Sequence, residues 1–256
     1  MNLGVSRSRL VVANAKMNLT PAEAERWASS LLAAQDRFRG VTVGLAPAFP
    51  ALERVARVLT GSPFLLVAQD VFQNAAGAYT GEVCATMLRD LGVSLVIVGH
   101  SERRSIRKET EADFSNKMAR LAESGLSPLY CVGETLADRE GGRAEKVLER
   151  QMAALDPFPS VPPGLALAYE PVWAIGSGRP ATAEMASEVH AGLRRMLASR
   201  YGGGAAAGTA ILYGGSVTPE NAPDLFGRDG IDGALVGGAS LDPKRFAAIL
   251  EAAARA

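Results

Sequence analysis

Short apolar segments rich in valine, leucine and isoleucine recur along the whole chain, and most of them lack strict alternation of apolar and polar residues. A continuous apolar run of this length is typical of a strand that is buried on both faces, as in a parallel sheet. We therefore predict eight strands, over residues 9–15, 41–47, 64–70, 94–100, 127–134, 165–171, 209–215 and 233–238.

Helical patterns with recognisable start signals lie between these runs. Residues 20–23 read TPAE, which is a capping box with proline at the first helical position. Residues 218–220 and 242–243 carry similar signals, so we predict that a helix opens at each of them. A further helix is expected over 182–202, where the helical pattern ends in glycine.

The regular succession of strand and helix indicates an α/β fold. Eight units in 256 residues average about 32 residues each, near the size of one βα repeat. With right-handed crossovers this predicts a (β/α)8 barrel that occupies residues 1–256 as a single domain. An open doubly wound sheet is the alternative, although no GxGxxG motif follows the first strand. Residues 156–164 and 201–208 are each predicted to be a single loop.

Composition narrows the classes of function. Lysine plus arginine and aspartate plus glutamate number 27 each, so no overall field favours nucleic acid or a membrane surface. A bound anion therefore needs a local site. Cys84 and Cys131 form no CxxC pair, and the N-terminal apolar run is too short for a signal peptide. We expect a cytoplasmic protein without a transmembrane segment, disulfide framework or zinc site.

Polar residues and glycines follow the predicted strands, and in a barrel these positions meet at one end. Taken singly, Lys16 reads as a solvated loop residue, Glu170 as a cap for a neighbouring helix, and His190 as a structural residue within a helix. The shared placement of the polar residues and glycines at strand ends favours a site with a base, an imidazole, a cation and an anion cradle. The strand-end set is Asn14, Lys16, Gln69, His100, Glu134, Glu170, Gly214-Gly215-Ser216 and Gly237-Gly238.

Seven motifs with characteristic order and spacing resemble the triosephosphate isomerase family over nearly the full chain. AYEPVWAIGSG and VGHSERR are the most specific of them. This resemblance implies interconversion of dihydroxyacetone phosphate and D-glyceraldehyde 3-phosphate in glycolysis and gluconeogenesis, without a cofactor or metal. The motifs are NAKMN (14–18), AYTGE (78–82), VGHSERR (98–104), CVGETL (131–136), AYEPVWAIGSG (168–178), YGGSV (213–217) and GALVGGASL (233–241).

The same resemblance implies a role for each matching residue. Glu170 resembles the family's base, and His100 resembles the neutral imidazole that polarises the substrate carbonyl. Lys16 supplies fixed positive charge, Asn14 orients the reacting oxygens, and Glu102 resembles a supporting carboxylate near Lys16. The phosphate of the substrate is expected at the backbone N–H groups of Gly176, Ser216, Gly237 and Gly238.

A lid and a homodimer are also implied by the resemblance. Residues 171–173 and 179–181 match the hinges of the family's lid, and residues 174–178 match its tip. Residues 71–82 resemble a protruding loop that enters a partner subunit. Thr80 on this loop is expected to approach the active site of that partner, near Asn14 and Glu102.

Four positions depart from the usual motifs. Ala15 stands where tryptophan is common, Asp70 replaces a common asparagine, Lys108 occupies a usual glycine position, and Pro180 lies in the second hinge. Asp70 is expected to add an ion pair at the dimer surface. Two other functions remain open at this stage: an isomerase of a four-carbon ketose phosphate on the same barrel, and a non-catalytic barrel that binds phosphosugars.

Overall fold

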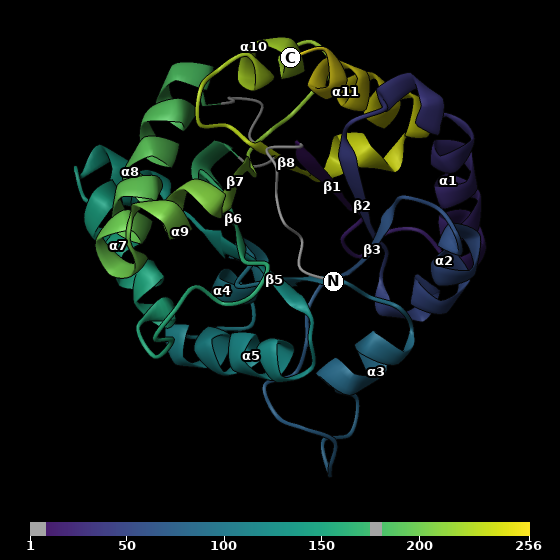
Figure 1. The fold of residues 1–256 in the computed structure, drawn as a ribbon, viewed down its shortest axis with the longest axis horizontal. Helices are drawn as coiled ribbons and strands as arrows, with labels where there is room; N and C mark the ends of the chain where they lie inside the picture. The colour runs from purple at the N-terminus through teal and green to yellow at the C-terminus, as the bar shows by residue number, and fades with distance from the viewer. Residues whose placement is uncertain (1–8, 175–180) are drawn as a thin grey trace.

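The computed structural model describes residues 9–174 and 181–256, and its strands form one closed parallel barrel (Figure 1). Each strand pairs with its neighbours in chain order, and the last strand pairs with the first. All eight predicted strands are confirmed, and each lies within its predicted segment. They are β1 (Leu10–Asn14), β2 (Thr42–Ala46), β3 (Leu65–Ala68), β4 (Leu95–Val98), β5 (Ser127–Val132), β6 (Ala166–Tyr169), β7 (Ala210–Tyr213) and β8 (Gly233–Val236).

The apolar core has two parts because side chains alternate along each strand. Leu10 and Val12 of β1 belong to a cluster that contains residues from every strand and fills the barrel. Val11 and Ala13 belong to a larger cluster that joins the outside of the barrel to the helices. Closure needs a glycine at Gly233, because a Cβ there would lie 1.8 Å from the carbonyl oxygen of Leu10. This two-sided burial explains why the strand segments read as continuous apolar runs.

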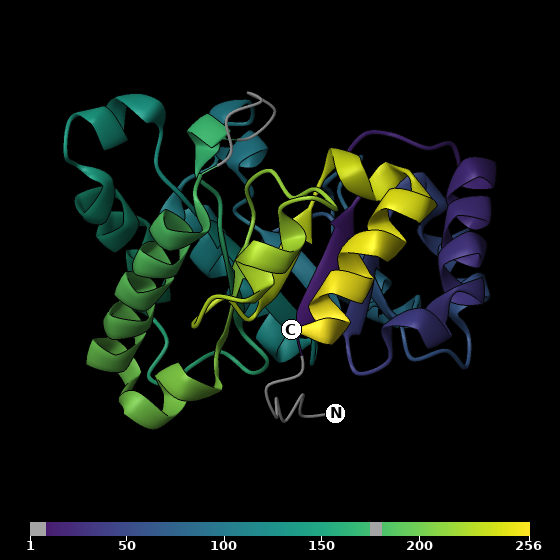
Figure 2. The same cartoon turned by 90° about the horizontal axis from the view of Figure 1, so that it is seen from above.

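Helices surround the strands in Figure 1, and Figure 2 shows the same arrangement turned by 90°. The capping box at Thr20, the cap at Asp242 and the helix that ends before Gly202 are confirmed. The α-helices are α1 (Pro21–Ala33), α2 (Leu52–Leu59), α3 (Ala85–Asp90), α4 (Ser101–Ser105), α5 (Glu111–Glu123), α6 (Leu136–Glu140), α7 (Ala144–Met152), α8 (Ala183–Tyr201), α9 (Gly203–Gly208), α10 (Ala222–Phe226) and α11 (Pro243–Arg255). Short 3-10 helices are η1 (Gln35–Phe38), η2 (Phe49–Ala51), η3 (Ala153–Leu155), η4 (Val172–Ala174) and η5 (Gly238–Leu241).

Two local predictions were wrong. The segment 201–208 is not a single loop, since α9 follows Gly202 at once; Gly202 has a φ of 85° that ends α8, and buried Ala206 anchors the new turn. The helix predicted to open at residues 218–220 begins at Ala222 instead. The side chain of Asn221 accepts a hydrogen bond from the Thr218 N–H at 2.8 Å, which closes a turn before the helix starts.

No helix in the described parts of the chain has both the length and the apolar character needed to cross a membrane. The proline-rich segment 156–164 is a loop between η3 and β6, as predicted.

Candidate active site

A cavity of about 390 Å³ opens where the strands end, and it collects most of the predicted site residues. Asn14 and Lys16 follow β1, His100 follows β4, and Glu170 follows β6. Ser216, Gly237 and Gly238 line the other part of the cavity, after β7 and β8. Gly176 and the other residues at 175–178 of the predicted lid tip (174–178) lie outside the described residues, as do Arg179 and Pro180 of the predicted second hinge.

Lys16 has a φ of 51°, a left-handed conformation that is uncommon for a residue with a side chain. Its N–H donates to Oδ1 of Asn14 at 2.9 Å, and its carbonyl accepts from the Gln69 amide, also at 2.9 Å. The ammonium group lies 2.9 Å from Glu102 Oε1. Asn14 and Gln69 therefore hold the backbone of Lys16 so that its charge stands at the mouth of the cavity.

His100 and Glu170 form a buried pair. Nε2 of His100 lies 3.0 Å from Oε1 of Glu170. His100 is also the N-cap of α4, where Nδ1 accepts a hydrogen bond from the Glu102 N–H at 3.2 Å. Because Nδ1 accepts, the ring proton is on Nε2 and faces the carboxylate. Oε2 of Glu170 accepts from the Ser101 N–H at 2.8 Å, so both carboxylate oxygens have partners.

The charges of this pair depend on each other. Burial opposes ionisation of Glu170, but His100 and the Ser101 N–H more than compensate, so the pKa of Glu170 is lowered. Burial likewise lowers the pKa of His100, while the Glu170 carboxylate raises it, and the net pKa is raised. Glu170 is therefore ionised and suited to accept a proton at neutral pH.

Glycines bring the backbone close to both ends of the cavity. A Cβ on Gly214 would lie 2.9 Å from Cγ of Glu170, so a side chain there would displace the carboxylate. A Cβ on Gly237 would lie 3.3 Å from Cε of Lys16, whereas the space beside Gly238 is open within 4 Å. This open backbone beside η5 can approach a phosphate group closely. Within the described residues, no group of three or more His, Cys, Asp or Glu side chains could hold a metal ion.

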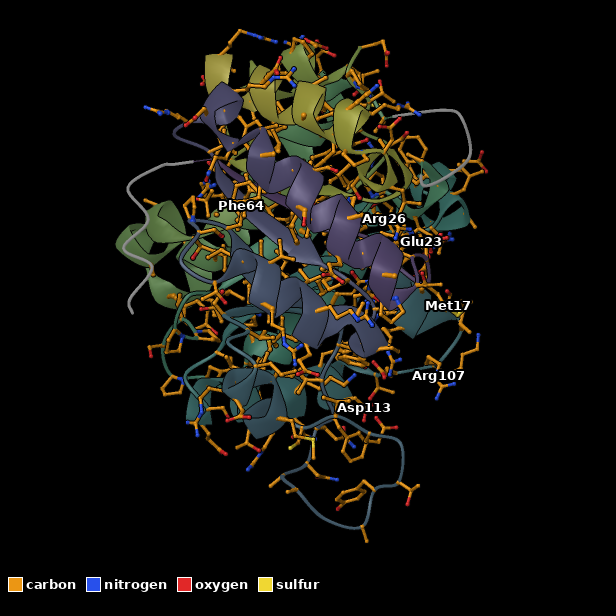
Figure 3. The ribbon with its side chains drawn as sticks, turned by 90° about the vertical axis from the view of Figure 1, so that its right-hand side faces the viewer. Met17, Glu23, Arg26, Phe64, Arg107 and Asp113 are labelled. Atoms are coloured by element: carbon orange, nitrogen blue, oxygen red, sulfur yellow. The ribbon has the colours of Figure 1, made fainter. Side chains whose placement is uncertain are left out.

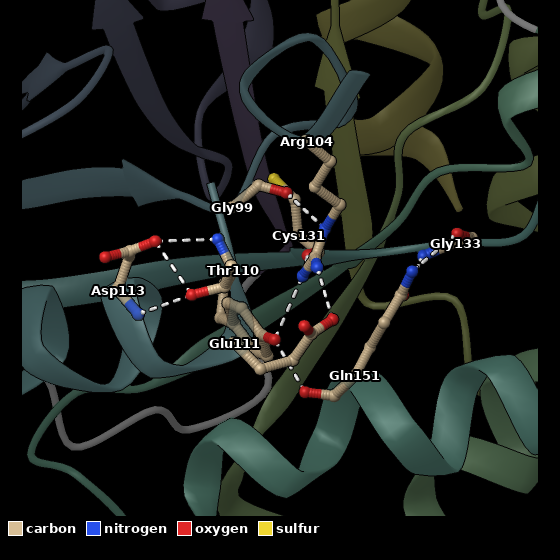
Figure 4. Close-up of polar contacts among 9 residues, drawn as sticks. Gly99, Arg104, Thr110, Glu111, Asp113, Cys131, Gly133 and Gln151 are labelled. Carbon is tan, nitrogen blue, oxygen red and sulfur yellow. Dashed lines mark hydrogen bonds and ion pairs between the residues drawn. The ribbon is translucent and has the colours of Figure 1, made fainter. Parts of the chain in front are cut away.

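Polar contacts of Arg104 in α4 hold Gly99, the residue before His100 (Figure 4). The Arg104 guanidinium donates to the Gly99 carbonyl at 3.0 Å and to the Cys131 carbonyl at 3.1 Å, and it pairs with Glu111 at 2.8 Å. Gln151 bridges the Gly133 backbone from both sides, at 2.7 and 3.0 Å. The strand end that carries His100 is thereby tied to the start of α5 and to β5.

Glu134 was predicted at the same barrel end, but it does not line the cavity. It is fully buried and accepts hydrogen bonds from the Tyr169 hydroxyl at 3.0 Å and from Trp173 Nε1 at 2.8 Å. Arg139 pairs with it at 3.2 Å. Glu134 therefore anchors Trp173 in the segment 171–173, which was predicted as the first hinge of the lid.

The remaining predicted residues have structural surroundings. Asp70 forms its ion pairs within the chain, with Lys117 at 2.7 Å and with Arg103 at 2.8 Å. Lys108 has a φ of 59°, which explains why glycine suits this position. His190 is fully buried in α8 and its Nδ1 lies 2.9 Å from the Gly230 carbonyl, in agreement with a structural role.

The sequence did not single out three residues that line the cavity: Asn18, Thr218 and Arg245. Asn18 stands inside the NAKMN motif, so its position was a usable signal. Thr218 was seen only as a helix start. Arg245 had no signal, because only the packing of α11 brings its first turn to the cavity.

Similarity to known proteins extends over nearly the whole chain. The family model described as "Triosephosphate isomerase" matches residues 9–253. The chain is 45% identical over 249 residues to a triosephosphate isomerase of Chlorobium phaeovibrioides, which covers 96% of this chain and 99% of that protein. It is 46% identical over 249 residues to that of Thermus thermophilus, with 96% and 99% of the two chains covered.

Proposed function

Because the chain belongs to the triosephosphate isomerase family and is an aldose–ketose isomerase of triose phosphates, we propose that Glu170, His100 and Lys16 perform its chemistry. The reaction interconverts dihydroxyacetone phosphate and D-glyceraldehyde 3-phosphate, a step of glycolysis. The observation that supports the assignment most strongly is the buried contact of 3.0 Å between Glu170 and His100, in one cavity with the Lys16 ammonium.

Glu170 is the proposed base. Its carboxylate removes a proton from the substrate carbon beside the carbonyl and returns one to the neighbouring carbon. His100 is proposed to pass the hydroxyl proton from one substrate oxygen to the other, so that no atom is lost or gained. Both oxygens are now bonded, to His100 and to the Ser101 N–H. The carboxylate must release at least the Ser101 contact to reach a substrate carbon. The desolvation of the free carboxylate then strengthens it as a base.

His100 and Lys16 are proposed to stabilise the enediolate. The Nε2–H of His100 faces Glu170 in this structure and can donate to the developing oxyanion once the carboxylate has moved to the substrate, and Asn14 orients the same oxygens. Despite burial, the pKa of His100 is raised by its contact with the Glu170 carboxylate, and the effect of that contact weakens when Glu170 moves to the substrate. Because Nδ1 accepts a hydrogen bond from the Glu102 N–H, the neutral imidazole is the proposed donor. The Lys16 ammonium adds a full positive charge, which Glu102 orients.

The phosphate is proposed to bind at Ser216, Gly237 and Gly238, with a contribution from Gly176 outside the described residues. The start of η5 and the open space beside Gly238 support this position. Backbone N–H groups at a helix start attract an anion without any overall charge on the protein. The proposed cycle needs no cofactor, because carbonyl polarisation and proton transfer both come from side chains.

A coupled assay with glyceraldehyde 3-phosphate tests this function. We expect the wild-type protein to turn over this substrate and Glu170→Gln to lose that turnover. Inorganic phosphate should still bind to the variant. A four-carbon ketose phosphate is the comparison substrate. Faster turnover of the four-carbon sugar would instead favour the alternative isomerase. Phosphosugar binding without turnover would favour the non-catalytic barrel.

A second copy of this chain is the proposed partner. Met17, which follows Lys16, and Ile106, at the end of α4, are 96% and 72% exposed, although both are large apolar residues. A loop with exposed Tyr79 projects beyond α3 in Figure 1, and Met17 and Arg107 lie along one edge of the molecule in Figure 3. A second cavity, of about 190 Å³, lies beside Lys16 and is bordered by Met17. It offers a place for the loop tip that carries Thr80.

We also propose that residues 1–256 act as one catalytic domain in the cytoplasm. Both cysteines of the chain, Cys84 and Cys131, are free and buried. Free thiols agree with a reducing compartment. Fractionation of source cells, with the protein followed by an antibody, tests the location.

A further inference from the structure

Arg245, in the first turn of α11, contributes to the lining of the catalytic cavity. It follows Leu241, the last residue of η5, by four residues, and Gly238 and Leu241 line the same cavity. Arg245 is exposed, and since it lines the cavity together with Gly238 and Leu241 of η5, we assign it to the end of the cavity where the phosphate is proposed to bind. No motif or family feature discussed above assigns it a role.

The charges around the cavity leave Arg245 available for a ligand. Among the described lining residues, Lys16 and Arg245 carry positive charge and Glu170 carries negative charge. Lys16 is paired with Glu102 at 2.9 Å, whereas Arg245 has no ion pair with any carboxylate in the described parts of the chain. Glu220 is within electrostatic range only: its pKa is lowered chiefly by a hydrogen bond with Thr218, and the charge of Arg245 contributes less.

The position of Arg245 is unfavourable for the helix itself. The N-terminus of a helix attracts negative charge and repels positive charge. α1, α5 and α8 each have an acidic residue in the first turn, whereas α11, like the shorter helices α3 and α9, has none. The first turn of α11 contains Lys244 and Arg245 instead, and only the N-cap Asp242 offsets them. Because Arg245 is unfavourable for the stability of α11, its presence indicates a role outside the helix.

We propose that Arg245 is a specificity-determining residue that binds the dianionic phosphate of the substrate from the open side of the cavity. Backbone N–H groups position a phosphate, but they carry only partial charges. A guanidinium group adds a full charge and a planar pair of donors that matches two phosphate oxygens. Since the chain has a formal net charge of zero, attraction of the substrate depends on such local charge.

This inference rests on the phosphate position proposed above, and its central test needs no turnover. Arg245→Gln is compared with Lys244→Gln, which makes the same change in net charge on an exposed neighbour that does not line the cavity. Inorganic phosphate is the probe, and its dissociation constant is obtained from the rise in melting temperature. Sodium chloride at equal ionic strength is the reference.

At low salt we expect the phosphate dissociation constant to rise about fivefold in Arg245→Gln and less than twofold in Lys244→Gln, because the exposed charge acts locally. Arg245→Lys should lie between, since it keeps the charge and loses the planar fork. At about 0.3 M salt the difference should shrink. With glyceraldehyde 3-phosphate, KM should rise in Arg245→Gln while kcat stays within about twofold.

Equal phosphate affinities in the two glutamine variants would overturn the inference. So would a fall in kcat without a rise in KM, which would indicate a disturbed site rather than lost phosphate recognition. If the wild-type protein binds phosphate but fails to turn over the triose phosphate, the proposed function fails while the comparison of phosphate affinities still decides the role of Arg245.

Discussion

At the scale of single residues, the position of one carboxylate, that of Glu170, is proposed to control the chemistry. Glu170 reaches His100 at 3.0 Å and the Ser101 N–H at 2.8 Å, so its side-chain length matches the site. Glu170→Asp retracts the carboxylate by about one C–C bond. A misplacement of ~1 Å can cost about 100-fold, so kcat should fall by roughly that factor. Steady-state kinetics measure the loss, and inorganic phosphate binding should stay unchanged as a control. An unchanged kcat would remove Glu170 from its proposed role.

A second residue-scale prediction concerns His190, which with His100 makes up all the histidine of the chain. Burial lowers the pKa of His190 to about 4, with Asp232 and Arg194 nearby. The unfolded chain therefore binds this proton more readily, so the stabilising contribution is present above about pH 6.5 and is lost as the pH falls. The difference between the folded and unfolded pKa values of His190 predicts that the free energy of unfolding falls by about 2 kcal/mol between pH 7 and pH 5.

His190→Asn tests this contribution, since its amide can still donate to the Gly230 carbonyl but does not titrate. Urea unfolding at both pH values should show a smaller loss of stability in the variant. The raised pKa of His100 has the opposite effect on the pH dependence of stability, but His100 is present in both proteins. The difference in pH dependence between the wild-type protein and the variant therefore reports on His190 alone. An equal pH dependence in the two proteins would contradict the prediction.

At the scale of elements, the connection between α4 and α5 holds an avoidable strain. Lys108 is exposed and has a φ of 59°, a conformation that costs a residue with a Cβ roughly 1–2 kcal/mol. Lys108→Gly should therefore stabilise the fold by roughly 0.5–1 kcal/mol, after the greater freedom of glycine in the unfolded chain is subtracted. Urea unfolding measures this gain. Lys108→Ala is the control: it removes the same charge but keeps the Cβ, so it should give no gain.

The elements also show what the sequence could predict. Every strand was predicted because a barrel buries both faces of each strand, which leaves continuous apolar runs. Residues 201–208 were predicted as a loop from their glycines, but Gly202 alone makes the break, and the following alanines continue into α9. The helix start at 218–220 was misplaced because the Asn221 side chain competes with the backbone for hydrogen bonds.

The sequence also predicted which strand-end residues come together, but not the direction of every side chain. Asn14, Lys16, His100 and Glu170 occupy the ends of strands, and the topology of a barrel brings such ends together. The direction of a side chain depends on packing that the sequence pattern does not contain. Glu134 accordingly turns away to Trp173, although its strand-end position resembles that of Glu170.

At the scale of the whole molecule, the residue that pairs with Lys16 lies at the protein surface. The side chain of Glu102, which orients the Lys16 ammonium, is 48% exposed, and Met17 stands beside it almost fully exposed. A surface of this kind is expected to be covered by a second copy of the chain, with Thr80 of one copy near Glu102 of the partner subunit. The proposed dimer should therefore restrain Lys16.

Thr80→Arg places a long charged side chain at the tip of the loop that enters the partner in this dimer. We expect light scattering to give a mass near twice 26.8 kDa for the wild-type protein and a concentration-dependent fall toward one chain for the variant. Activity should fall together with the dimer fraction, because a monomer leaves Glu102 and Lys16 without the partner's contact. Arg107→Glu, a charge change on an exposed residue outside the loop, is a second probe of the same surface. The dimer fraction and the activity should fall together in both variants. A fully active monomer would contradict the proposal and would show that Asn14 and Gln69 hold Lys16 without the partner subunit.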